Sequence, residues 1–289
     1  GILRKISLNF GNADQAYRLL IIGFLTLVDL SIWTVLKKWF GSIVAFIFFL
    51  SPISIIISGY HHQFDNLAIL IALLFVWTFG RQTSKLSRKQ VISLFILGLS
   101  LATKHIFFAY PLWLAIRQKG FKQKILVVLI PILVFIVSFV PFWSEGSHGI
   151  IKNVFLYKSF NNTPLWYSVV PNFMQGVLRP DLLFYGAFIL FGFITRKKTI
   201  IESILIYTLV LVAFSPAIAN QYLAIIMPAI AVYTNMFFVL YILYASILLL
   251  TSAAGLHINT LITHLPSFLI SPVNKDFIRT YDFLVVLLV

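Results

Sequence analysis

The chain has 289 residues, of which 60% are hydrophobic and 10% charged, and it contains no cysteine. A soluble domain carries about 25% charged residues, so this composition excludes an ordinary soluble protein, and the lack of cysteine excludes disulfides and thiolate metal sites. The formal net charge of +14 would indicate nucleic-acid binding in a soluble protein. Here the basic residues lie mostly between apolar runs, so we interpret them as topology signals and predict no nucleic-acid partner.

Apolar runs recur along the chain and predict an all-α fold. We expect one polytopic transmembrane helical bundle over residues 1–289, with about nine crossings plus short re-entrant or interfacial helices. The short runs 91–103 and 105–116 are expected to form a hairpin without a complete crossing, and so is the pair after Gln221. In chain order the runs are 19–36, 41–58, 65–79, 91–103, 105–116, 125–142, 182–195, 199–214, 222–233, 236–251 and 281 onward.

The basic residues predict the orientation of this bundle. Four short connections hold 13 basic residues and no acidic one, and the positive-inside rule places these connections in the cytosol. The polar segments then fall on the opposite, non-cytosolic face, where we expect the functional site. The cytosolic basic residues are Lys37, Lys38, Arg81, Lys85, Arg88, Lys89, Arg117, Lys119, Lys122, Lys124, Arg196, Lys197 and Lys198. The non-cytosolic segments are 59–65, 104–105, the outer loop 143–180, 215–221 and the outer loop 252–280.

The first polar segment, residues 58–66, reads Ser-Gly-Tyr-His-His-Gln-Phe-Asp-Asn. Such groups between two membrane helices are costly unless they are paired or functional. In the purely structural interpretation, Asp65 stabilises the N-terminus of a helix, and His61 and His62 are ordinary residues of the membrane interface. Asp65, His61 and His62 could hold a divalent metal ion, but their spacing is a weak ligand pattern. We predict no metal site and no cofactor, with a divalent metal as the open alternative.

The second polar segment is the pair Lys104 and His105, which interrupts an apolar stretch. A lysine can bind phosphate as a point charge, or it can simply extend toward the membrane interface. Residues 215–221 favour a plain helix–helix turn. The outer loop 143–180 combines aromatic and amide side chains, which suit sugar binding or an interfacial helix equally well.

Taken together, these motifs resemble a known family. Ser51-Pro52, residues 59–66, and Lys104-His105 with Pro111 resemble the GT-C class of multi-pass membrane glycosyltransferases. They are most similar to the dolichyl- or polyprenyl-phosphate-glucose (or mannose) dependent glucosyltransferases. Residues 41–116 carry the resemblance well, and 214–228 loosely resemble a later motif of related mannosyltransferases. The resemblance implies a hexosyltransferase on the non-cytosolic face of a prokaryotic cell membrane or endoplasmic reticulum.

The same resemblance implies the partners and the site. The donor would be a polyprenyl-phosphate sugar and the acceptor a lipid-linked sugar or glycan, both within reach of membrane lipid. In this class the catalytic carboxylate lies in the first outer loop, so we expect the base to precede Gly1, in a longer protein of which this chain is a fragment. The catalytic residue is therefore unassigned, with Asp65 as a weak candidate. The implied substrate-binding residues are His61, His62, Gln63, Asp65, Lys104, His105, Gln221 and Tyr222.

Two other functions compete with hexosyl transfer. A transporter or flippase for lipid-linked sugars would need polar residues near the membrane midplane, and often shows internal repeats. A surface-polysaccharide polymerase or ligase would share the lipid-linked substrate and a large outer loop. The polar residues gather at helix ends, and this pattern favours the transferase.

Overall fold

A computed structural model describes residues 13–80, 86–156, 160–161 and 179–251, together with the single positions 171, 174, 256, 258, 284, 287 and 288. Within these residues the chain is all-helical, apart from a two-residue antiparallel pair between β1 (Phe160–Asn161) and β2 (Ala217–Ile218). The all-α prediction is confirmed. The predicted outer loop 252–280, most of 157–178, Arg81, Lys85 and the run from 281 lie essentially outside the described residues.

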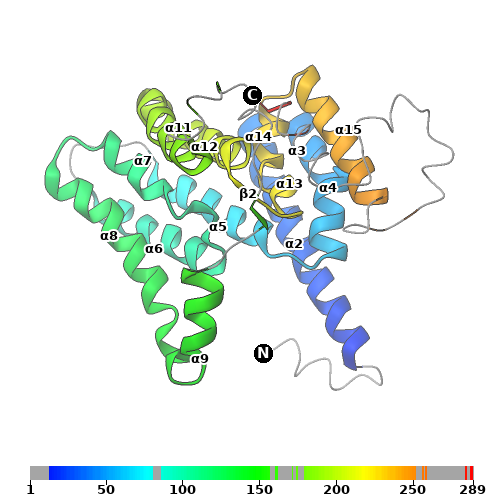
Figure 1. Cartoon of the computed structure of the whole chain (residues 1–289), viewed down its shortest axis with the longest axis horizontal. Coiled ribbons are helices and arrows are strands. Elements are labelled where there is room, and N and C mark those ends of the chain that lie inside the picture. The colour runs from blue at the N-terminus through cyan, green and yellow to red at the C-terminus, as the bar shows by residue number, and fades with distance from the viewer. Residues whose placement is uncertain are drawn as a thin grey trace.

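The helices follow the predicted apolar runs closely (Figure 1). Several runs are divided into shorter helices, and each division has a local cause. In chain order the helical elements are α2 (Ala13–Phe40), α3 (Ser42–Phe49), α4 (Pro52–Ile55), η1 (Ile56–Tyr60), α5 (Asp65–Phe79), α6 (Arg88–Thr103), η2 (His105–Phe107), α7 (Tyr110–Arg117), α8 (Phe121–Val137), η3 (Val140–Phe142), α9 (Trp143–Ile150), η4 (Ile151–Phe155), α11 (Pro180–Ile194), η6 (Thr195–Lys197), α12 (Ile200–Phe214), α13 (Tyr222–Ile225), α14 (Met227–Val232) and α15 (Met236–Thr251).

Helix α2 is apolar on both sides. Leu25, Ile32 and Leu36 are buried on the face that packs inward, whereas Leu27 and Leu30 are exposed. An outward face of leucines suits lipid rather than water. By length and composition, residues Asp14–Phe40 and Phe121–Phe155 could each cross a membrane, and the bent pair Ser42–Phe49 and Pro52–Tyr60 would add a third span if it is one broken span. The second of these segments turns back on itself around η3, as described below. About nine crossings stays a prediction.

Prolines divide two of the predicted runs, and a change of backbone conformation separates two others. Pro52 begins α4 and bends it by 47° from α3, because proline fits the first position of a helix and not its interior. Pro228 follows the break at Ile226 between α13 and α14 in the same way. Lys104 is extended between α6 and η2. This third break lies where the sequence separates the runs 91–103 and 105–116.

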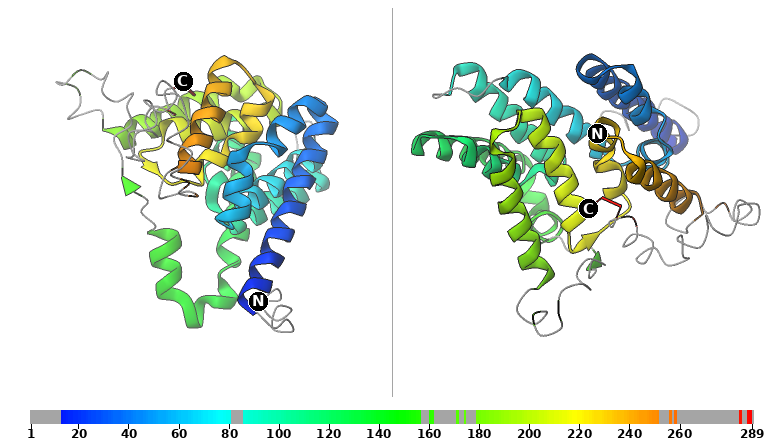
Figure 2. Two further views of the ribbon diagram at one scale, coloured as in Figure 1. Left: turned by 90° about the vertical axis from the view of Figure 1, so that its right-hand side faces the viewer. Right: turned by 90° about the horizontal axis from the view of Figure 1, so that it is seen from above.

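The segment after α8 is helical and reverses direction, so the first part of the predicted outer loop 143–180 contains α9 and η4. The Phe155 ring lies 6.0 Å from Phe135 and 5.9 Å from Phe139. A straight helix would separate residues twenty positions apart by about 30 Å. The chain therefore turns back around η3, and α9 lies beside the end of α8 (Figures 1 and 2).

Gly98 allows α6 and α8 to approach each other closely. A Cβ atom at Gly98 would lie 2.5 Å from Val134 Cβ and 3.0 Å from the Pro131 carbonyl oxygen. Small residues at contacts between membrane helices allow such close backbone approach.

We therefore expect Gly98→Ala to destabilise the protein. Overpacking costs about 1–3 kcal/mol, which exceeds the roughly 1 kcal/mol gained from better helix propensity. The matched control is Gly23→Ala in α2, because nothing lies within 4 Å of a Cβ added there. Thermal unfolding in detergent should show a lower midpoint for Gly98→Ala and an equal or higher one for Gly23→Ala. Equal midpoints for both variants would contradict the tight contact.

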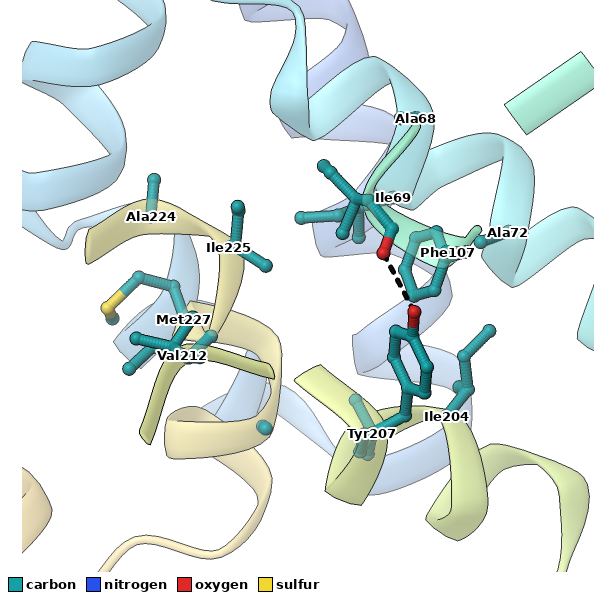
Figure 3. Close-up of a cluster of buried hydrophobic side chains, with 14 of the residues drawn as sticks. Ala68, Ile69, Ala72, Phe107, Ile204, Tyr207, Val212, Ala224, Ile225 and Met227 are labelled. Carbon is teal, nitrogen blue, oxygen red and sulfur yellow. Dashed lines mark hydrogen bonds between the residues drawn. The ribbon is translucent and has the colours of Figure 1, made fainter. Parts of the chain in front are cut away.

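An aromatic cluster joins α12 to the break after Lys104. The Tyr207 ring stacks on Phe107 at 5.7 Å, and its hydroxyl donates a hydrogen bond to the Ile106 carbonyl at 3.0 Å (dashed in Figure 3). The same hydroxyl accepts a hydrogen bond from the Ala109 N–H at 3.2 Å. Tyr207 is buried. These contacts fix η2, and with it the backbone that follows Lys104.

Several contacts involve basic residues that the sequence predicts to face the cytosol. Lys38 lies over the Trp77 ring at 4.7 Å, close to the end of α5. Arg117 donates hydrogen bonds to the Thr195 carbonyl at 3.2 Å and to the Lys198 carbonyl. Asp65 begins α5 and Trp77 lies near its end, so Lys38 and Asp65 are at opposite ends of this helix.

Candidate functional site

A cavity of about 320 Å³ brings together residues from five segments of the chain. Asp65 opens α5, Lys104 and His105 come from the α6–η2 break, and Gln221 and Tyr222 lie at the start of α13. These are five of the eight residues predicted to bind substrate. The remaining lining residues are Ile106, Asn153, Leu211 and Ile225.

Lys104 is the centre of the polar contacts in this cavity. Its Nζ donates hydrogen bonds to Asp65 Oδ2 at 2.9 Å and to Gln63 Oε1 at 3.1 Å. The Lys104 side chain is 23% exposed and that of Asp65 is 1% exposed. A buried carboxylate needs such a partner, whereas the ammonium group keeps access to the cavity. Asp65 Oδ1 is buried and has no hydrogen-bond partner among the described residues.

Local backbone structure explains how residues far apart in sequence meet. Helix α5 begins at Asp65 with no side-chain cap from Phe64, so the carboxylate lies at the helix N-terminus, where the helix dipole favours a negative charge. Helix α6 ends at Thr103, and the extended Lys104 then directs its side chain to the neighbouring helix. The two helices pack against each other, and the Ser100 hydroxyl donates to the Ala68 carbonyl at 2.7 Å.

The structure does not place His61 and His62 in the lining of this cavity. Both are half-buried, and their Nε2 atoms are enclosed without a hydrogen-bond partner. Burial lowers the pKa of the His61 imidazole from its ordinary value, and His62 lowers it further, which favours the neutral form near pH 7. Among the described residues no three His or acidic side chains form a group that could hold a metal ion, so Asp65 does not join the two histidines in a ligand set.

His62 adopts the left-handed conformation, with φ 54°. This conformation costs most residues about 1–2 kcal/mol and costs glycine almost nothing. We expect His62→Gly to be more stable than His62→Ala by about 1 kcal/mol. His61 is the matched control, because its φ of −82° should make the alanine variant the more stable one. Thermal unfolding of the four variants measures both differences, and the same order at both positions would contradict the observed backbone.

Part of the cavity lining comes from a segment that the sequence favours as a plain turn. Ala217–Ile218 pairs with Phe160–Asn161, and the chain then enters α13, where Gln221 and Tyr222 line the cavity. Asn153 of η4 also lines it. The sequence places Asn153 in an aromatic and amide-rich loop but does not single it out, because its position depends on the reversal after α8.

A second cavity, of about 510 Å³, adjoins the first. The two share His105, Ile106 and Leu211. The second is lined almost entirely by apolar and aromatic side chains of α7 and α11, with contributions from α8 and α12. They include Leu112, Trp113, Ile132, Phe184, Phe188 and Ile189. A polar cavity therefore opens beside an apolar one, with His105 at the junction.

A buried polar cluster behind the cavity is absent from the predicted site. Asn66 Nδ2 donates hydrogen bonds to Asp29 Oδ1 at 2.6 Å and to Ser58 Oγ at 3.0 Å. All three residues are buried. Asp29 lies near the middle of the 28-residue helix α2, and the signal that could have found it is an acid in the apolar interior of that helix, away from its ends.

Comparisons with known protein families, with characterised proteins and with solved structures find no match to this chain.

Proposed function

We propose that this chain belongs to a multi-pass membrane glycosyltransferase. The enzyme moves a hexose from a polyprenyl-phosphate donor to a lipid-linked or glycan acceptor on the non-cytosolic face. The observation that carries the proposal is the pair of adjoining cavities: Lys104 opens onto the polar one, and apolar and aromatic side chains line the other. A lipid phosphate has the matching chemistry, with a charged head and an apolar chain.

The polar cavity contains the groups that a phosphate-linked sugar would need. Lys104 supplies a cation for the phosphate. Asn153 and Gln221 offer acceptors and donors for sugar hydroxyls. In the transfer, the bond from the sugar C1 to the phosphate oxygen breaks and a bond from C1 to the acceptor oxygen forms. The acceptor's proton passes to a base, and the polyprenyl phosphate leaves with the electron pair.

The charge distribution supports the proposed topology of about nine crossings. Lys38 with Trp77, and Arg117 with Thr195 and Lys198, join basic segments that the sequence assigns to the cytosol. Asp65 lies at the other end of α5 from Trp77. The cavity then opens to the non-cytosolic side, where lipid-linked sugar donors are used.

One observation favours the transporter as a second candidate. Asp29 is an acidic side chain buried near the middle of an apolar helix long enough to cross a membrane. Such residues often mark ion or proton pathways. The two candidates differ in what the protein does to a labelled sugar, because a transporter moves it unchanged and a transferase makes a new glycosidic bond.

The test uses the full-length protein carrying this chain, reconstituted in lipid nanodiscs with an acceptor-containing lipid extract. Labelled polyprenyl-phosphate hexose and labelled nucleotide sugar are supplied in parallel, and products are separated by chromatography. Transfer from the polyprenyl donor alone is the expected result. A folded protein that transfers none of several hexoses, or that moves lipid-linked sugar across a liposome membrane without changing it, would overturn the proposal.

The same preparation tests the apolar cavity without any turnover. A prenyl phosphate with a photoreactive group in its chain should cross-link to peptides covering 105–116 and 180–195. Excess unlabelled prenyl phosphate should prevent this labelling, whereas free inorganic phosphate should not. Labelling spread evenly over lipid-exposed α2 would contradict a specific site.

A further inference from the structure

The first turn of α5 carries two consecutive polar side chains that contact different neighbours. Asp65 pairs with Lys104 on the cavity side. Asn66 turns away from the cavity and donates to Asp29 of α2 and Ser58 of η1. The first turn of α5 is therefore held by Lys104 on one side and by Asp29 and Ser58 on the other.

The Asp29 contact has the features of a strong hydrogen bond. The distance from Asn66 Nδ2 to Asp29 Oδ1 is 2.6 Å, and charge-assisted bonds of this kind are short. The Asn66 amide also donates to Ser58 Oγ at 3.0 Å. Through these two hydrogen bonds Asn66 links α5 to α2 and η1.

The first turn of α5 has no side-chain cap. Phe64 precedes α5 and provides no side-chain hydrogen bond to the first turn. The position of the turn therefore depends on the two Asn66 hydrogen bonds on one side and on Lys104 on the other. Because Asp65 and Asn66 are adjacent in the chain, a shift of Asn66 would move Asp65 and loosen its pairing with Lys104.

We propose that Asp29 is a positioning residue for the Asp65–Lys104 pair. It acts through Asn66, which it holds by a hydrogen bond from within the membrane helix α2. The effect on sugar transfer rests on the proposed function, but the effect on the geometry of Lys104 does not. The alternative role of Asp29, as an ion or proton carrier, requires its charge, whereas positioning requires only a hydrogen-bond acceptor.

Four variants separate these roles. Asp29→Asn keeps an acceptor oxygen for Asn66 and removes the charge. Asp29→Leu removes both, and the double variant Asp29→Leu/Asn66→Leu replaces both partners with apolar side chains, which restores folding if Asp29→Leu alone is unstable. The matched control is Asp14→Asn, an exposed acid in the first turn of the same helix.

The first readout does not depend on transfer. The rate at which an amine-specific reagent labels Lys104, and the hydrogen exchange of the peptide around residues 61–70, are measured by mass spectrometry in nanodiscs. Asp29→Leu and the double variant should raise both rates by about tenfold, the effect of losing one charge-assisted hydrogen bond. Asp29→Asn and Asp14→Asn should stay within about threefold of the unmodified protein.

The second readout separates kcat from KM. Asp29→Leu should lower kcat by about 10- to 100-fold through misplacement of the pocket, and Asp29→Asn should restore most of it. Equal loss in Asp29→Asn and Asp29→Leu would overturn the proposal in favour of a charge-dependent role. Unchanged Lys104 labelling in Asp29→Leu and the double variant would overturn it outright. If the labelling changes as expected while no variant transfers sugar, the proposed function fails and the positioning role stands.

Discussion

Replacing Lys104 with Met should weaken binding of the polyprenyl-phosphate donor by about 30-fold or more. A hydrogen bond to a charged group contributes about 1.5–3 kcal/mol, and 2 kcal/mol corresponds to roughly 30-fold in affinity. Methionine keeps the length of the side chain and removes the charge. The measurement is equilibrium binding of a fluorescent prenyl phosphate to the protein in nanodiscs.

The single variant also leaves the buried Asp65 carboxylate without its partner. Removing one member of a buried pair costs about 3–5 kcal/mol, so low binding could reflect a damaged protein. The double variant Lys104→Met/Asp65→Asn removes both charges and should recover the thermal unfolding midpoint while binding stays weak. Lys104→Arg should bind better than Lys104→Met. Donor affinity unchanged in both the single and the double variant would remove Lys104 from the site.

Asp65→Asn should reduce transfer by about 100-fold while the protein stays folded in membranes. Asparagine has nearly the same shape and can still accept a hydrogen bond from Lys104, which remains partly exposed to the cavity. Donor affinity should be equal or higher, because the carboxylate no longer competes with phosphate for the ammonium group. The rate of transfer is measured as an initial rate and the donor affinity by equilibrium binding, both on the same preparation.

The plainer role of Asp65 is that of an acid at a helix N-terminus, which contributes about 0.3–1 kcal/mol to stability. Asp181→Asn is a control for that role, because Asp181 occupies the first turn of α11 and pairs only with Arg179 among the described salt bridges. If Asp65→Asn transfers sugar as fast as the Asp181→Asn control, Asp65 stabilises the helix and takes no part in the reaction.

Sequence patterns predicted the elements well where the signal was local. The run 65–79 coincides with α5, 199–214 nearly coincides with α12, and 236–251 coincides with α15. The break at Lys104 was also predicted, because a charged residue interrupts an apolar stretch at that point. Pro52 divided the run 41–58, a division that the sequence analysis did not predict.

Tertiary contacts decided how the site is assembled. Gln221 and Tyr222 were expected in the site only through a family resemblance, and nothing local distinguishes residues 215–221 from a plain turn. His61 and His62 looked as promising as Gln63, yet Gln63 contacts Lys104 and neither histidine lines the cavity. Asn153 was missed for the same reason, because its place in the cavity depends on the reversal after α8. Asp29 had a local signal, an acid in the apolar interior of α2, but its partner Asn66 lies 37 residues along the chain.

The sequence by itself determined that this protein is all-helical and built largely of apolar segments, because too few charged residues are present to cover a soluble core. It also determined where most helices begin and end, because periodicity, proline and charge act over a few residues. Only the tertiary structure decided that the Asp65–Lys104 pair lies where a polar cavity adjoins an apolar one. That arrangement depends on the reversal after α8, the α6–α8 contact at Gly98 and the Asp29–Asn66 hydrogen bond, which are set by packing between distant segments.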